Sequence, residues 1–368
     1  MRTTVLSRRR CLMAGAAALG AMSMNPCQAQ APDPDCRRCR GTGLVPPAAP
    51  KPFVFVEGVG SFRAAEAVAA EHCPVCQPMA DRAELVEQAS ERHATVRKRH
   101  QEWEDRTGWR LVLVQTRHAA IHTQHQPIEA RRIGQAVEKF TIHLQNVTGS
   151  LILTPTQPDK YEQMLLLGQR SWDQFRKVLE GLYTSEQLGE PWLPARQLSS
   201  YDLFHIPHAF STPDRLRELP PAYQAVKFAA TRSIMLATAW RAPSWLAEGF
   251  GAYAQQAALE DVRISTVYSS ERGPKAIYSL RDAKLQSRER KVRPWEDLLT
   301  RELRDFEPAD YTQSLGMVAF LLDSQPARFL EFVRLLKAGT PCAAAMEQAY
   351  DKDHTILSLD AGKWLARA

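Results

Sequence analysis

Two Cys-x-x-Cys pairs near the N-terminus constrain the fold of this chain more than any other feature. Cys36 and Cys39 form the first pair, Cys73 and Cys76 form the second, and 33 residues lie between them. A Cys-x-x-Cys turn presents two thiolates on one side, so two such turns can complete a tetrahedral shell around Zn²⁺. Between the pairs, Phe53–Val56 predicts a strand. The four cysteines therefore predict a closed, structural zinc site.

This pattern predicts a small zinc ribbon over residues 30–80. The run Cys36–Gly43 resembles one CxxCxGxG repeat of the DnaJ-type co-chaperones, and the resemblance implies metal binding. Disulfides in an oxidising compartment and redox-active thiols remain the alternatives. Cys342 stands among small residues and is expected to be a buried free thiol.

The first 29 residues have the composition of an export signal. Arg8–Arg10 give a basic start, Cys11–Met24 form an apolar stretch, and Cys27–Ala29 offers small residues at both positions that a signal peptidase reads. The run Ser7–Leu12 resembles the twin-arginine motif, whose route exports folded proteins. Because the apolar stretch is too short to span a membrane, we expect cleavage and a periplasmic or secreted protein without a transmembrane segment. Cleavage after Ala31, a lipid on Cys27 and a buried N-terminal helix are the alternatives.

Charge gives little reason to expect a nucleic-acid partner. The chain has 47 basic and 41 acidic residues, but four of the arginines lie in the signal, so the remainder is close to neutral. No basic stripe with interleaved aromatic residues follows the signal. The hydrophobic content of 44% and the eight Trp residues indicate a folded core and exclude a disordered chain.

The remaining sequence predicts a linker helix followed by a mixed domain. Residues 81–107 are charged and helical in pattern, with one stripe along an exposed helix formed by Val86, Ala89, His93, Val96, His100 and Trp103. Strands are expected at 109–114, 119–123 and 151–154. Helices are expected at 127–148, 159–182, 222–240, 244–260, 294–304, 310–323, 326–338 and 341–349. The proline-rich stretch 184–222 predicts loops, and the order of strands before helices indicates an α+β domain over 108–368.

The histidines form two groups that a metal could use. His118, His122 and His125 lie near the second expected strand, and His205 and His208 lie in the proline-rich stretch. They match no established ligand spacing, so a polar or partly buried surface is the other interpretation.

One stretch of the main domain carries a sharper signal. The run Pro243–Tyr253 contains Trp-Leu-Ala-Glu-Gly and resembles the WLxEGxAxY segment of gluzincin-type metallopeptidases, especially peptidase MA-like domains of bacterial exported proteins. The resemblance implies a thermolysin-like fold, with Glu248 as a vestige of the third zinc ligand. It also implies that Tyr311 corresponds to a tyrosine that steadies the tetrahedral intermediate, and packing is the alternative role for this residue.

The same comparison shows that the catalytic motif is missing. The family carries HExxH on the preceding helix, with two His on zinc and a Glu as general base, and no HExxH occurs in this chain. The register that we predict places Thr231 and Met235 at the two His positions and Arg232 at the catalytic Glu. None of these residues can replace the lost group. Glu248 could instead stabilise its own helix start if Ser244 caps the helix.

These features predict an exported, catalytically inactive gluzincin-like protein with one structural zinc. It is expected to bind a polypeptide or a cell-wall component. An active hydrolase or metallopeptidase with a non-standard metal site is the alternative. Because a partly desolvated carboxylate needs a counter-charge, we also predict that helix 222–240 packs on helix 244–260 with Arg232 bonded to Glu248.

Overall fold

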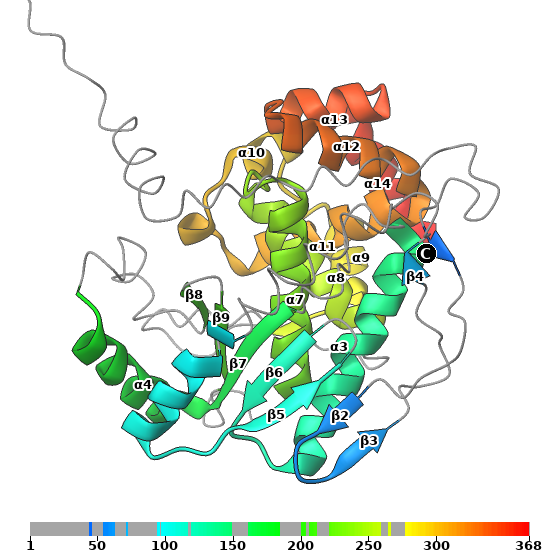
Figure 1. Cartoon of the computed structure of the whole chain (residues 1–368). Coiled ribbons are helices and arrows are strands. Elements are labelled where there is room, and N and C mark those ends of the chain that lie inside the picture. Colours follow the sequence, from blue (N-terminus) through cyan, green and yellow to red (C-terminus); the bar gives the residue numbers. More distant parts are fainter. Residues whose placement is uncertain are drawn as a thin grey trace, which may run out of the picture.

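The computed structural model has an α+β fold in which a mixed sheet precedes a helical half (Figure 1). It describes residues 44–45, 54–62, 71–72, 94–95, 97–116, 119–148, 161–184, 200–203, 206–211, 221–258, 264–265 and 277–367. All structural statements below concern these residues.

A seven-stranded sheet forms the first half. Its spatial order is β3-β2-β5-β6-β7-β9-β8. Strands β6, β7 and β9 run parallel, and the other neighbours pair antiparallel. The strands are β2 (Val54–Val56), β3 (Gly60–Phe62), β5 (Val112–Gln115), β6 (Ala119–Thr123), β7 (Tyr161–Leu167), β8 (Ser200–Leu203) and β9 (Ile206–Ser211). Two short antiparallel ladders lie outside it: β1 (Leu44–Val45) with β4 (Glu71–His72), and β10 (Ile264–Ser265) with β11 (Ile277–Tyr278).

The strand expected at the centre of the ribbon belongs to this large sheet. Strand β2 confirms the strand predicted at Phe53–Val56, but it pairs with β5 through Phe55 opposite Gln115 and Val56 opposite Val114. The Val56 side chain is fully buried in the main core. Strand β2 lies within the expected ribbon module, residues 30–80, but pairs with a strand of the expected main domain, residues 108–368.

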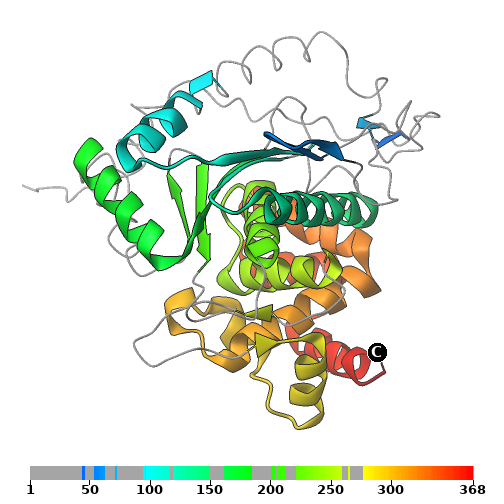
Figure 2. The same cartoon turned by 90° about the horizontal axis from the view of Figure 1, so that it is seen from below.

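The two faces of the sheet are covered by different helices. On β7, Leu165 belongs to the larger core cluster, whereas Met164 and Leu166 belong to a second cluster on the opposite face, as the period of two along a strand requires. Helices α3 (Pro127–Thr148) and α7 (Pro221–Ala237) lie on the first face. Helix α4 (Gly168–Leu182) and the helical segment 97–107 lie on the second (Figure 2).

This arrangement corrects the exposed stripe predicted for residues 81–107. His100 is 2% exposed and Trp103 is completely buried. The Trp103 ring lies 5.1 Å from the Phe175 ring, and the His100 ring lies 3.9 Å from that of His122. Because the second face of the sheet is apolar, it needs a cover, and this stripe supplies part of it. Residues 81–93 and Val96 lie outside the described residues.

Helix α11 is the centre of the helical half. It spans Pro308–Ser324, and 13 of its 17 residues are buried, because helices α8, α9, α12 and α14 all pack around it. The surrounding elements are α8 (Ser244–Ala258), α9 (Leu280–Arg288), α10 (Trp295–Thr300), the 3₁₀ turn η1 (Leu303–Asp305), α12 (Pro326–Ala338), α13 (Cys342–Tyr350) and α14 (His354–Arg367).

Two expectations about the sheet were wrong. The helix predicted for 159–182 begins as strand β7 and becomes helical only at Gly168. The proline-rich stretch expected as loop contains β8 and β9, which pair with each other. The strand expected at 151–154 lies outside the described residues.

Candidate functional site

Helices α7 and α8 lie side by side and run antiparallel. The Gln255 amide donates a 2.7 Å hydrogen bond to the Tyr223 carbonyl oxygen, and the Thr231 hydroxyl donates to the Ala247 carbonyl oxygen at 3.4 Å. Gly251 lies at the crossing. A Cβ on Gly251 would come within 2.8 Å of the Thr231 hydroxyl oxygen, so the close approach of the two helices depends on this glycine.

A buried ion pair joins these two helices. The Lys227 Nζ donates to the Glu248 Oε2 at 2.7 Å. The Glu248 side chain is 9% exposed and that of Lys227 is 20% exposed. Because the carboxylate is largely removed from water, it needs this cation close by. The predicted packing of α7 on α8 is confirmed, and Glu248 has a partner from the facing helix.

The identity of that partner corrects the predicted pairing. The residue that bonds to Glu248 is Lys227 rather than Arg232. Lys227 and Thr231 are one turn apart, and both border Gly251 on α8, so this side of α7 faces α8. The predicted bond of Arg232 to Glu248 is therefore wrong, because α7 is rotated so that Lys227 reaches the carboxylate instead.

The start of α8 also differs from the capping interpretation of Glu248. Ser244 is the first residue of the helix, and Leu246 and Ala247 donate their backbone N–H groups to the Pro243 carbonyl oxygen. Glu248 lies beyond the first turn, which contains no acidic residue. Its charge is balanced by Lys227, so the helix dipole is not its main compensation.

The neighbouring contact of α8 with α11 places Tyr311 in the core. Gly249 packs on the backbone of Ser314, and Tyr311 lies one turn before Ser314 on α11. The Tyr311 side chain is 4% exposed, and its ring packs edge-on against Phe306 with centroids 5.2 Å apart. This surrounding favours the packing role.

Three titratable side chains meet nearby, and only one of them, Tyr253, belongs to the stretch that the sequence singled out. The Tyr253 hydroxyl on α8 donates to the Asp323 Oδ1 on α11 at 2.7 Å, and the His143 Nε2 on α3 lies 3.4 Å from the same hydroxyl. Burial raises the pKa of Asp323 and lowers that of His143. Burial beside Asp323 also raises the pKa of Tyr253, which therefore stays protonated. These residues are 110 and 70 positions apart from Tyr253, so no local pattern could have indicated the cluster.

The expected histidine groups form no metal site that the structure describes. His122 lies on β6 in contact with the ring of His100, and His125 is 8% exposed just after this strand. Burial lowers the pKa of His125. His118, His205 and the side chain of His208 lie outside the described residues. Within the described residues no group of three metal-binding side chains is present.

The four cysteines of the predicted zinc site also lie outside the described residues. The ladder of β1 with β4 lies between them in sequence. It pairs Leu44, which follows the first cysteine pair by five residues, with His72, which directly precedes Cys73. The backbone five residues after the first Cys-x-x-Cys segment is therefore hydrogen-bonded to the backbone directly before the second.

Cys342 is a free thiol at the start of α13. It is partly exposed as a residue, but burial of the sulfur raises the pKa of its thiol to about 11. Because the thiolate is the reactive form, only about one molecule in a thousand is reactive near pH 8. We expect iodoacetamide to leave Cys342 unmodified in the folded protein at about pH 8 and to modify it in urea. Peptide mass mapping measures both, and rapid labelling of folded protein would contradict this assignment.

No described helix combines the length and hydropathy needed to cross a membrane. Comparison of the chain with protein-family models, curated proteins and solved structures finds no match.

Proposed function

We propose that this chain is an exported, catalytically inactive gluzincin-like protein that binds a polypeptide or a cell-wall component. The observation that carries this proposal is the ammonium of Lys227 on the carboxylate of Glu248, at 2.7 Å. In the active peptidases that the WLAEG stretch resembles, a zinc ion would neutralise the corresponding carboxylate. Here a side chain of the protein supplies the positive charge.

The residues of α7 that face α8 support loss of the zinc chemistry. If Lys227 takes the place of the first histidine of HExxH, Phe228 and Thr231 take the places of the glutamate and the second histidine, one turn before the register expected from the sequence. An ammonium cannot ligate a metal while it is protonated, and a phenyl ring cannot serve as a base. A divalent cation at Glu248 would also be repelled by the Lys227 charge.

The N-terminal part of the proposal is a structural zinc site formed by Cys36, Cys39, Cys73 and Cys76. The β1–β4 ladder supports it, because it pairs Leu44, five residues after Cys39, with His72, which directly precedes Cys73. A site with four thiolate ligands leaves no open position, so its role would be to stabilise the fold. The signal-like residues 1–29 support export to the periplasm or beyond it.

Zinc content tests the metal part of this proposal. We expect about one zinc per purified chain by elemental analysis, and loss of that zinc when Cys36 and Cys73 are both replaced by Ser. A chain with Cys342→Ser is the matched control and should keep its zinc. A second zinc that survives the double replacement would favour the alternative, a hydrolase with a non-standard metal site.

Peptidase assays test the catalytic part. We expect no chelator-sensitive hydrolysis of unfolded casein by the purified protein, because the part of the chain that the structure describes holds no group of three metal-binding side chains and pairs Glu248 with Lys227. A Glu248→Gln variant serves as the control for contaminating activity. Hydrolysis that EDTA stops and that Glu248→Gln also abolishes would overturn the proposal of an inactive site.

A further inference from the structure

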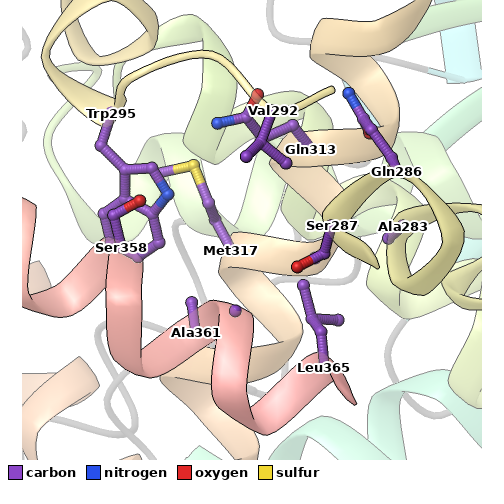
Figure 3. Close-up of a pocket in the computed structure, with 12 residues that line it drawn as sticks. Ala283, Gln286, Ser287, Val292, Trp295, Gln313, Met317, Ser358, Ala361 and Leu365 are labelled. Carbon is purple, nitrogen blue, oxygen red and sulfur yellow. The ribbon is translucent and has the colours of Figure 1, made fainter. Parts of the chain in front are cut away.

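A notch lies among helices α9, α11 and α14 (Figure 3). Its volume is about 40 Å³, which is room for one or two methyl groups. Gly316 and Met317 of α11 line it, whereas Ser314 and Val318 of the same helix face α8. The notch therefore lies on a different side of α11 from the helix that carries Glu248.

Small residues create this notch. A Cβ on Gly316 would lie 3.2 Å from the Ala283 Cβ and 3.4 Å from a methyl carbon of Leu365, so α9 and α14 approach α11 closely there. On α14, a Cβ on Gly362 would meet only the Ser287 hydroxyl oxygen, at 3.6 Å. The notch is thus open beside Gly362. Figure 3 shows its apolar lining, formed by Val292, Trp295, Met317, Ala361 and Leu365.

Exposed apolar side chains gather on the elements that border the notch. Eight large apolar side chains are exposed among the described residues, and four of them belong to α9, the loop after it or α14: Leu285, Val292, Ile356 and Leu359. Val292 lines the notch itself and is 39% exposed. The other three lie on the bordering helices but do not line the notch, so Val292 is the exposed apolar side chain that a molecule bound in the notch would contact.

One polar atom at the notch has an unused bonding capacity. The Gln286 amide nitrogen donates to the carbonyl oxygens of Lys291 and Ala309. Its Oε1 is buried and accepts no hydrogen bond within the described part of the chain. A buried acceptor without a donor costs free energy, but this oxygen is covered by the protein, so a bound molecule could donate to it only after the Gln286 side chain turned toward the notch.

The segment that borders the notch is strongly basic. Residues 281–293 contain six basic and two acidic side chains. Lys291 pairs with Glu289, and Arg293 pairs with Glu307 and Asp310. The other four form no ion pair among the described residues: Arg281, Lys284, Arg288 and Arg290. This surface is therefore complementary to a partner with several negative charges.

We propose that the notch is a docking site for an acidic polypeptide segment with one aliphatic anchor residue. The anchor fills the notch between Met317 and Leu365. Flanking carboxylates pair with Arg288 and Arg290. This site goes beyond the function proposed above and depends on neither Glu248 nor the zinc site.

Fluorescence anisotropy with labelled synthetic peptides tests this proposal on the full chain. The probes are four seven-residue peptides, Asp-Glu-Asp-X-Glu-Asp-Glu, in which X is Leu, Ile, Met or Asn. We expect at least one aliphatic peptide to bind about tenfold more tightly than the Asn peptide, because burial of two methyl groups has about this effect. Absence of binding by all four, or equal binding by all four, overturns the proposal.

Three variants separate the notch from general electrostatic attraction. Gly362→Ala adds a methyl group at the notch where only Ser287 is near, so we expect an unchanged or higher melting temperature and at least fivefold weaker binding. Arg290→Glu is expected to weaken binding, with a salt dependence lower than that of the unmodified chain. The matched control Arg170→Glu on α4 should bind normally. Binding that Gly362→Ala leaves intact, or that Arg170→Glu lowers as much as Arg290→Glu does, overturns the proposal.

Discussion

Replacing Lys227 with Met is expected to lower the free energy of unfolding by about 3 kcal/mol. The substitution keeps an unbranched side chain of nearly the same length but removes the charge. It leaves the Glu248 carboxylate, which is 9% exposed, without its cation. Breaking a buried ion pair by removing one partner typically costs ~3–5 kcal/mol. We place this pair at the lower end of that range because Lys227 is 20% exposed. Urea denaturation followed by circular dichroism measures the change.

A double variant shows whether the ion pair is the cause. In Lys227→Met with Glu248→Leu no charge is left buried, so we expect the protein to recover most of the lost stability. Arg232→Ala is the matched control on the same helix and should cost less than about 1 kcal/mol, although the sequence had indicated Arg232 as the partner. If Arg232→Ala destabilises the protein more than Lys227→Met does, the ion pair of Lys227 with Glu248 is not the main stabilising interaction of Glu248.

The two predictions of the α7–α8 contact show what local sequence can and cannot indicate. The Trp-Leu-Ala-Glu-Gly run singled out Glu248. The resemblance that this run carries, together with the need of a desolvated carboxylate for a counter-charge, predicted that the two helices pack together. The partner of Glu248 depended on the rotation of α7 about its own axis. Its hydrophobic stripe is broad, with seven buried residues over Pro221–Ala237, so several registers fitted the sequence equally well. Gly251 fixes the register through its contact with Lys227 and Thr231.

For the fold as well, local pattern predicted some elements, whereas others depend on contacts between distant segments. Helix 127–148 was predicted with its observed bounds because a single apolar face repeats along it. Strand β7 was predicted as helix because it is a short buried strand whose Met164, Leu165 and Leu166 face opposite sides, and both sides are apolar. Strands β8 and β9 were missed because the prolines around them indicated loops, although the two strands pair with each other and β9 also pairs with the distant strand β7.

The burial of His100 and Trp103 could not be predicted from the local sequence either. Their spacing correctly indicated one face of a helix, but the charged residues around them indicated an exposed one. Only the sheet reveals the second apolar face that this stripe covers, through Phe175 and His122. Burial is a property of the assembled layers, so it follows from tertiary structure rather than from periodicity alone.

Replacing Gly249 with Ala is expected to be among the most damaging single changes in the helical half. The added Cβ would lie 2.3 Å from the Ser314 carbonyl oxygen and 2.9 Å from a methyl carbon of Val318. The first of these neighbours is backbone, so α8 and α11 must move apart to relieve the overlap. Overpacking of a close-packed core typically costs ~1–3 kcal/mol. We expect a loss of about 3 kcal/mol because α11 is the most buried helix of this half.

Gly181→Ala is the matched control for this effect. Gly181 lies in α4, and an added Cβ there would have no neighbour within 4 Å, so only the higher helix propensity of Ala acts and a gain of up to ~1 kcal/mol is expected. Thermal unfolding of the two variants gives opposite shifts if helix contact is the cause. A Gly249→Ala protein as stable as the unmodified chain would mean that α8 and α11 are not held together at this glycine. Because Glu248 directly precedes Gly249 on α8, the position of Glu248 would then have to be fixed by contacts other than the α8–α11 contact.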